Sequence, residues 1–378
     1  MNDTLPKPIG DWLRMMVARK ASDLFLTAGF PPAIKLDGKV TPISKQTLTP
    51  AETLNMARSV MTERVRAEFD AHNEANFAIH DLQIGRFRVS AFVQQGRVGV
   101  VFRLVNTRIP KLEELHLPPI LQDIAMMPRG LVLVVGATGS GKSTSLAAMI
   151  GHRNHVAQEH IITVEDPIEY VHVHDRCIIT QREVGTDTES WEVALKNTLR
   201  QAPDVIMLGE IRDVEAMEYA LAYAETGHLC LSTVHANNAN QTMDRILSFF
   251  PRERRDQVLL DLAMHLRAIV SQRLLPRIDG KGRIPAVEVL LNSPLIADMI
   301  KEGRIFEIKD VMAKSRDLGM QTLDQSLFDL YKAGVVSAED ALRNADSFND
   351  LRLKIKLHRE GREDGQPSAA AINHLDII

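Results

Sequence analysis

The stretch that decides the fold is Gly136-Ala137-Thr138-Gly139-Ser140-Gly141-Lys142-Ser143-Thr144, which directly follows the apolar run 131–135. It fits the pattern G-x-x-x-x-G-K-[S/T], and a buried strand before it with a helix after it is the context that confirms such a match. The glycines let backbone N–H groups turn inward around a phosphate, and the start of the helix adds its dipole. The stretch therefore predicts a phosphate cradle for ATP, and an unliganded glycine-rich turn is the alternative.

Each position of the cradle has an expected role. Lys142 places a positive charge on the β- and γ-phosphates, and the hydroxyl of Ser143 is expected to ligate Mg²⁺. The remaining residues expected to contact the nucleotide are Gly136, Thr138, Gly139, Ser140, Gly141 and Thr144. A cradle alone binds nucleotide, so hydrolysis needs further groups for the metal and the attacking water.

Two carboxylates follow apolar runs that read as parallel strands, at the edge where ligands of open α/β sheets collect. Glu165 follows the run 161–164, and Glu210 follows the run 205–208. We expect Glu210 to orient or deprotonate the attacking water, and Glu165 to hold Mg²⁺ and its water shell. The alternative for either residue is a solvated loop acid.

Two histidines, His228 and His235, bracket the apolar run 229–234. A histidine at a strand end is usually a structural, neutral donor, but the pair favours a place in the nucleotide site, with His235 as a sensor of the γ-phosphate. Asp204 and Arg212 are candidates for positioning Glu210.

Composition limits which classes of protein the chain can belong to. The chain has 378 residues, 45% hydrophobic and 25% charged, which suits two soluble globular domains. A net charge of −4 argues against a protein whose main work is coating nucleic acid. Cys177 and Cys230 are too few for a disulfide framework or a four-cysteine zinc site. We expect neither a signal peptide nor a membrane-spanning helix.

The pattern of residues changes along the chain and predicts five segments. Residues 1–105 read as an α+β domain whose strands near 76–82, 86–94 and 98–105 form an antiparallel meander. A proline-containing linker covers 106–119, and an α/β domain with a parallel sheet covers 120–292. Helical patterns fill 293–357, and 358–378 read as a disordered tail.

Four boxes in order resemble those of secretion-superfamily ATPases. Besides the cradle, they are 165–169, resembling the Asp box; 200–204 with 209–213, resembling the Walker B region; and 224–236, resembling the His box. The likeness runs from 21–24 to 319–325, and the type IV pilus retraction branch (PilT and PilU) matches best. It implies a PAS-like N-terminal domain, a RecA-like P-loop ATPase domain and a hexameric ring with ATP between subunits.

Features outside the boxes refine the resemblance. Pilus-extension and type II secretion ATPases usually carry an extra N-terminal domain and a four-cysteine metal loop. This chain shows neither feature, which favours retraction over extension or secretion. Three features look more like PilU: Phe25, the run 235–241 and the tail. Residues 296–300 depart from the Ala-Ile-Arg-Asn-Leu motif of PilT-like chains. Arg88 and Arg103 match arginines that this family's N-terminal domain presents to nucleotide. Their alternative is a solvated sheet face.

The resemblance implies a cytoplasmic hexameric motor that hydrolyses ATP to drive pilin subunits back into the inner membrane. Its expected partners are a platform protein in that membrane and a PilT-like retraction ATPase. One alternative is an accessory ring ATPase that depends on such a companion. A pilus-extension or secretion ATPase, or a nucleic-acid translocase, is a weaker alternative, because a translocase would suit a more basic balance.

Overall fold

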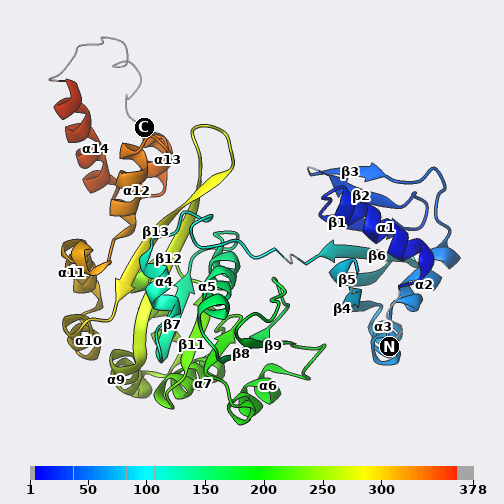
Figure 1. Cartoon of the computed structure of the whole chain (residues 1–378), viewed down its shortest axis with the longest axis horizontal. Helices are drawn as coiled ribbons and strands as arrows, with labels where there is room; N and C mark the ends of the chain where they lie inside the picture. The colour runs from blue at the N-terminus through cyan, green and yellow to red at the C-terminus, as the bar shows by residue number, and fades with distance from the viewer. Residues whose placement is uncertain (1–4, 37, 82, 106–107, 364–378) are drawn as a thin grey trace. The chain divides into compact units, whose positions relative to one another are not determined.

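The computed structural model describes residues 5–36, 38–81, 83–105 and 108–363, and of residues 361–363 it describes the backbone only. The chain divides into two compact units, one made of residues 1–109 and 158–202, the other of 110–157 and 203–378. Figure 1 labels the helices and strands.

The first unit contains a six-stranded antiparallel sheet with the order β3-β2-β1-β6-β5-β4. Its strands are β1 (Asp23–Thr27), β2 (Ala33–Leu36), β3 (Lys39–Pro42), β4 (Glu74–Asp81), β5 (Gly85–Gln94) and β6 (Arg97–Leu104). The predicted meander β4-β5-β6 is confirmed. It forms because Phe87, Val89 and Ala91 alternate with polar residues, so one face of β5 is buried.

Three helices accompany this sheet: α1 (Lys7–Ala18), α2 (Pro50–Ser59) and α3 (Glu63–His72). α1 buries Ile9, Leu13 and Met16, which recur at helical spacing. α2 begins where Thr49 and Glu52 form a capping box, as the Thr-Pro signal predicts. The same unit includes the parallel pair β8 (His160–Glu165) and β9 (Ile178–Glu183), and α6 (Trp191–Thr198).

In the second unit, five strands of one sheet lie side by side in the order β13-β12-β7-β11-β10. They are β7 (Gly130–Val135), β10 (Val205–Leu208), β11 (Leu229–Val234), β12 (Leu266–Pro276) and β13 (Arg283–Leu291). β12, β7, β11 and β10 run parallel, and β13 pairs antiparallel with β12. β7 and β11 are buried along their whole length, as continuous apolar runs predict.

Helix α4 (Ile120–Ala125) precedes β7. Between or after the other strands come α5 (Lys142–Val156), α7 (Val214–Glu225), α8 (Ala239–Phe249) and α9 (Arg255–His265). The C-terminal part is helical, as predicted, with α10 (Pro294–Lys301), α11 (Ile308–Lys314), α12 (Leu323–Lys332), α13 (Ala338–Arg343) and α14 (Phe348–Glu363). Helices α12–α14, orange to red in Figure 1, share an apolar core with the β12–β13 hairpin.

Two predictions need comment. A disordered tail over 358–378 is wrong for 358–363, which are the last turns of α14; residues 364–378 lie outside the described residues. The helix continues because Ile355 is buried and the ring of His358 packs edge-on against Phe328, with centroids 5.8 Å apart. The second is the predicted α/β domain over 120–292. The compact units group 158–202 with residues 1–109, so the predicted domain boundaries stay predictions.

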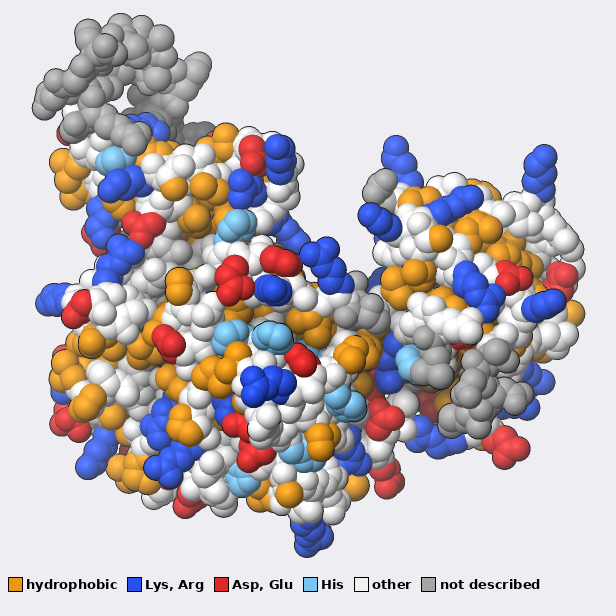
Figure 2. Space-filling model, viewed as in Figure 1, with side chains coloured by type: hydrophobic (Ala, Val, Ile, Leu, Met, Phe, Trp, Pro, Cys, Tyr) orange, Lys and Arg blue, Asp and Glu red, His pale blue; other side chains and the backbone are white. Residues whose placement is uncertain are grey.

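The surface carries both signs of charge. Figure 2 shows Lys and Arg side chains interspersed with Asp and Glu over the face in view. That mixture is what a net charge of −4 from 45 basic and 49 acidic residues leads one to expect. Across the part of the chain that the structure describes, no helix combines the length and the apolar character needed to cross a bilayer.

Candidate nucleotide site

The phosphate loop leaves the carboxyl end of β7, a strand flanked on both sides by parallel neighbours. The loop runs from Gly136 to Gly141, and α5 begins at Lys142 with Gly141 as its N-cap. This strand–loop–helix order is the one predicted. It aims the free N–H groups of the first turn of α5 toward the loop, where an anion is stabilised.

Two glycines are required by the space around them. Gly136 has φ +147°, and a Cβ there would lie 2.5 Å from both the carbonyl oxygen of Gln272 and Oγ of Ser140. Gly141 has φ +94°, and a Cβ there would lie 2.6 Å from Nε2 of Gln272. Because the loop folds tightly against β12, neither position can accept a side chain without moving its neighbours.

Lys142 and Ser140 point polar groups at the loop. Nζ of Lys142 donates to the carbonyl oxygens of Gly136, at 2.8 Å, and Ala137, at 3.1 Å. Burial lowers the pKa of Lys142, an effect that the charge of Glu210 opposes. Oγ of Ser140 is buried and has no hydrogen-bond partner among the described residues. Such a group is costly to leave unpaired, so it is suited to an acceptor such as a phosphate oxygen.

Gln272, on β12, holds the phosphate loop, and the sequence did not reveal this contact. Its Nε2 donates to the carbonyl oxygen of Ser140 at 2.7 Å, and its Oε1 accepts from Oγ of Ser145 at 2.7 Å. The side chain is buried, so both bonds are protected from water. One amide therefore fixes the loop and the first turn of α5 to the sheet. A lone glutamine, more than 120 residues from the loop, offers no local signal.

Glu210 lies just beyond β10, between two partners. Its carboxylate contacts the guanidinium of Arg212, and its Oε2 lies 3.4 Å from Nε2 of His235. The Arg212 hydrogen bond, with the charges of Arg212, His235 and Lys142, holds the pKa of Glu210 below its usual value. The carboxylate is therefore ionised at neutral pH, the form that can accept a proton from water.

Backbone pairing explains why these groups meet. Val234 of β11 is in register with Val135 of β7, so residue 235 and the phosphate loop leave the same edge of the sheet. The backbone N–H of Ile211 donates to the carbonyl oxygen of Thr233 at 2.9 Å, which holds the segment after β10 beside β11. Three neighbouring parallel strands thus bring Lys142, Glu210 and His235 together, as the sequence predicts.

Two other residues singled out from the sequence, His228 and Asp204, lie away from this group within the second unit. His228 precedes β11, and its carbonyl oxygen accepts from the N–H of Gly130, at the start of β7. Its Nδ1 lies 3.0 Å from Oγ1 of Thr226. Asp204 likewise precedes β10. Both residues therefore lie at the amino edge of the strands, opposite the phosphate loop, whereas Arg212 does contact Glu210 as expected.

Glu165 ends β8 in the first unit and is buried. Its Oε1 accepts from Oγ1 of Thr163 at 2.7 Å and from Nε2 of Gln181 at 3.2 Å. Burial raises the pKa of Glu165, and these hydrogen bonds oppose the rise. The alternative of a solvated loop acid is wrong, because the carboxylate is almost fully enclosed.

Arg88 and Arg103 are directly opposite each other on β5 and β6. Both are exposed on one face of the sheet, so the two side chains are neighbours. Nε of Arg103 donates to the buried carboxylate of Asp23 at 2.7 Å. This contact fixes one arginine of the pair, and the register keeps the other beside it.

A pocket of about 300 Å³ opens beside the loop within the second unit. Its walls come from the segment before α4, the start of α5 and the β12–β13 hairpin. The lining residues are Glu114, Leu115, His116, Leu117, Gly141, Thr144, Ser145, Gln272, Leu274, Arg283 and Pro285. The lining combines polar side chains with the apolar surface of Leu115, Leu274 and Pro285, a mixture that can take a flat heterocycle attached to a phosphate chain.

We expect the substitution Gln272→Leu to weaken nucleotide binding about tenfold. Two buried hydrogen bonds are lost, each worth about 0.5–1.5 kcal/mol, while the side-chain volume is nearly kept. Titration with a fluorescent ADP analogue measures the effect. Gln321→Leu is the matched control, because Gln321 also bonds the hairpin, donating to Val287, but lies away from the loop. Equal affinity in Gln272→Leu and the parent would remove Gln272 from nucleotide binding.

Comparisons with known proteins agree on one group. A family model described as "Type II/IV secretion system protein" matches residues 4–327. The type IV pilus ATPase PilU of Pseudomonas aeruginosa is 58% identical over 365 residues, 97% of this chain and 96% of that protein. The type IV pilus retraction ATPase PilT of the same organism is 39% identical over 337 residues, 89% of this chain and 98% of that protein.

A solved structure shares both the fold and the arrangement of elements. The crystal structure of the pilus retraction motor PilT with bound ADP superimposes with a TM-score of 0.85 at 40% identity. The match covers 91% of this chain and 98% of that one. The ATPase DotB of Legionella pneumophila follows with a TM-score of 0.77 at 25% identity.

Proposed function

Because the chain belongs to the family of type II/IV secretion system proteins, we propose that it is an ATP-hydrolysing motor for type IV pilus retraction. The resemblance predicted from the four boxes is confirmed, as is the fold, a RecA-like ATPase domain preceded by a smaller PAS-like α+β domain. The observation that carries the proposal is the meeting of Lys142, Glu210 and His235 at three adjacent strand ends.

The chemistry assigned to this site is in-line attack of water on the γ-phosphate of ATP. Lys142 releases its two loop carbonyls and places its charge on the β- and γ-phosphates. Glu210 accepts a proton from the attacking water, and Arg212 keeps the carboxylate ionised and oriented. His235 lies against Glu210 and is exposed enough to meet the γ-phosphate.

A magnesium ion fits the residues present. Mg²⁺ usually takes one or two protein oxygens and completes its shell with phosphates and water, and the Ser143 hydroxyl is exposed at the start of α5. Ser143 would hold the ion directly, whereas the predicted role of Glu165, which belongs to the first unit, stays a prediction. When bound, the ion supplies positive charge that neutralises the phosphate oxygens.

The pocket beside the loop takes the base of the nucleotide in this proposal. Leu115, Leu274 and Pro285 supply apolar surface for a ring, and Thr144 faces the same space from α5. The phosphate chain would then extend from the pocket across the start of α5 to Lys142. Bound ATP would then contact the predicted phosphate cradle, residues 136–144, along its length.

The assembly proposed is a homo-hexameric ring at the cytoplasmic side of the inner membrane, in contact with the pilus platform protein. Nucleotide-driven domain movement would be passed to that partner and withdraw pilin subunits. The second candidate is an accessory ring that needs a PilT-like companion. The departure of 296–300 from the Ala-Ile-Arg-Asn-Leu motif favours it.

The purified chain tests the proposal through its turnover of ATP over a range of protein concentrations. Specific activity that rises with concentration supports active sites completed by ring assembly. Turnover above that of a PilT-like ATPase alone, seen only when the two proteins are mixed, supports the accessory ring. Absence of turnover by the chain alone and of any gain on mixing would refute the proposed motor.

We expect replacement of both Arg88 and Arg103 by Gln to lower kcat about tenfold, because an arginine can stabilise charge on the transferring phosphoryl group. Glutamine keeps a polar contact for Asp23, so the sheet is preserved. Steady-state ATP hydrolysis with sedimentation of the ring measures the effect. Arg97→Gln, an exposed arginine on β6, is the control. If the double variant formed intact rings and hydrolysed ATP at the parent rate, the two arginines would be no more than part of a solvated sheet face.

A further inference from the structure

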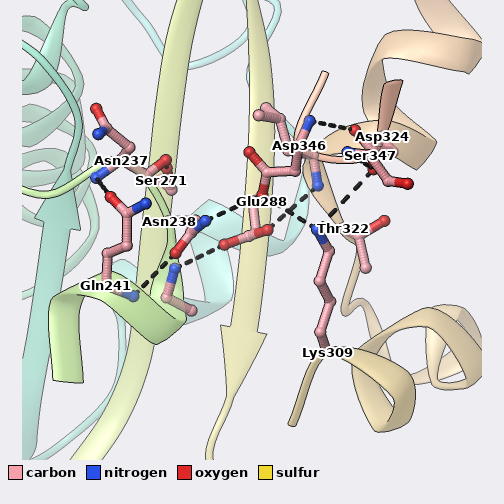
Figure 3. A network of polar contacts seen from close by, with 12 residues as sticks. Asn237, Asn238, Gln241, Ser271, Glu288, Lys309, Thr322, Asp324, Asp346 and Ser347 are labelled. Carbon is pink, nitrogen blue, oxygen red and sulfur yellow. Dashed lines mark hydrogen bonds and ion pairs between the residues drawn. The ribbon is translucent and has the colours of Figure 1, made fainter. Parts of the chain in front are cut away.

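The loop between β11 and α8, residues 235–238, is held by side chains from distant parts of the second unit. Oγ of Ser271, on β12, donates to the carbonyl oxygen of Asn237 at 2.8 Å. Nδ2 of Asn238 donates to Oδ2 of Asp346 at 3.1 Å. Figure 3 shows these contacts converging from both strands of the hairpin and from the C-terminal helices. The loop carries His235, so its position decides how His235 meets Glu210.

Glu288 is the central member of this network. It is buried on β13, in register with Ser271 on β12. Its Oε1 accepts from the N–H of Ala239, the first residue of α8, at 2.7 Å. Its Oε2 accepts from the N–H of Leu323, the first residue of α12, at 3.3 Å. One carboxylate therefore joins the starts of two helices, where negative charge is stabilised by both dipoles.

Asp346 extends the link into the C-terminal helices. Its Oδ1 accepts from Nη2 of Arg273 at 2.8 Å, and its Oδ2 from Nζ of Lys309 at 3.1 Å. The two oxygens of Asp324, on α12, accept from the N–H groups of Asp346 and Ser347. Side chains and backbone groups of α11, α12, the segment before α14 and the loop 235–238 thus share one polar network of buried and half-buried groups (Figure 3).

The composition of the network makes it sensitive to any displacement. Three carboxylates, those of Glu288, Asp324 and Asp346, face two cations, Lys309 and Arg273. Burial strengthens each bond, and an acceptor that loses its partner there leaves an unpaired group. A shift of α12 relative to the hairpin therefore either breaks the bond between Glu288 and Leu323 or is followed by a shift at the start of α8.

We propose that Glu288, with Asp346 and Asn238, is a positioning link through which the C-terminal helices α12–α14 set the place of His235 beside Glu210. The link acts on hydrolysis and not on nucleotide affinity, since the phosphate loop is held separately by Gln272. It rests on the roles proposed for Glu210 and His235. A partner that moves the C-terminal helices would change turnover by this route.

Two variants cut the link at different points. Glu288→Gln keeps the shape but turns an N–H group toward one of the two helix starts. Asn238→Ser keeps an N-cap for α8, because serine caps helices well, and loses only the bond to Asp346. We expect kcat to fall about fivefold in Glu288→Gln and about threefold in Asn238→Ser, with the Kd for ADP unchanged, as for coupling through a shared network.

Hydrogen exchange followed by mass spectrometry gives a readout independent of activity. Peptides covering 235–249 should exchange faster in both variants, while those covering 136–156 should exchange as in the parent. Ser326→Ala is the matched control, because Oγ of Ser326 accepts from the N–H of Val287 and so joins β13 to α12 without touching the loop. It should leave kcat and the exchange of 235–249 unchanged.

Three results would overturn the link: parent exchange over 235–249 in Asn238→Ser, equal losses in Ser326→Ala, or a loss confined to ADP affinity. Glu210→Gln in the same assay separates this proposal from the function on which it rests. Hydrolysis by that variant at the parent rate would refute the catalytic site, whereas exchange over 235–249 would still test the link itself.

Discussion

Glu210→Gln is expected to lower kcat about 10³-fold while leaving ADP affinity within about twofold of the parent, as removal of a general base does. Glutamine has the same shape and can still accept from Arg212, so the strand end should keep its geometry. It cannot take a proton from water, and it loses the charge that Arg212, His235 and Lys142 stabilise. Single-turnover hydrolysis and a fluorescent-ADP titration separate the two quantities.

Glu218→Gln provides the control for this expectation. Glu218 is also paired with an arginine of the second unit, Arg254, at 2.6 Å, but it lies exposed on α7. An exposed pair contributes little to stability, so its loss should leave kcat unchanged. If both variants hydrolyse ATP as the parent does, Glu210 is not the base, and the assignment of the strand-end site is wrong.

The phosphate loop could be predicted because all its determinants are contiguous. Glycine positions, Lys142 and the buried strand before them lie within about ten residues, and each has its own physical reason. Glu210 could be predicted for a related reason: it follows a short apolar run, and parallel strands present their carboxyl ends at one edge. Contacts across the sheet leave no such local pattern, which is why the contacts of Gln272 and Glu288 could not be predicted from the sequence.

His228 lies apart from the phosphate loop for a simple reason. Bracketing of a strand by two histidines does not distinguish its two ends. A six-residue strand spans about 20 Å at roughly 3.3 Å per residue, so residues before and after it cannot line the same small site. The register of β11 with β7 places His235 at the phosphate edge and His228 at the other.

The β12–β13 hairpin was missing from the predicted elements because α9 gives no sign of ending. The helix stops at His265, and β12 begins at Leu266 with no glycine or proline between them. Apolar residues continue through the junction, so period alone does not separate helix from buried strand there. Yet this hairpin carries both Gln272 and Glu288, on which the loop and the proposed link depend.

Gly136→Ala is expected to weaken nucleotide binding by about 10²-fold or more and to lower the free energy of unfolding by about 2 kcal/mol. The backbone at φ +147° is unfavourable for alanine, and the new Cβ would lie 2.5 Å from the Gln272 carbonyl and the Ser140 hydroxyl. Relief requires the loop to move off β12, which breaks the Gln272 bond to Ser140. Denaturant unfolding and ADP titration measure the two effects.

Gly334→Ala isolates the backbone cost from the cost of crowding. Gly334 has φ +70° with nothing within 4 Å of an added Cβ, and it lies in the turn after α12. Only conformational strain of about 1 kcal/mol is expected there, with nucleotide affinity unchanged. If Gly136→Ala bound ADP as tightly as Gly334→Ala, the loop could shift off β12 without loss of binding. The hydrogen bonds that Gln272 makes to the loop and to α5 would then result from packing and would not be required for nucleotide binding.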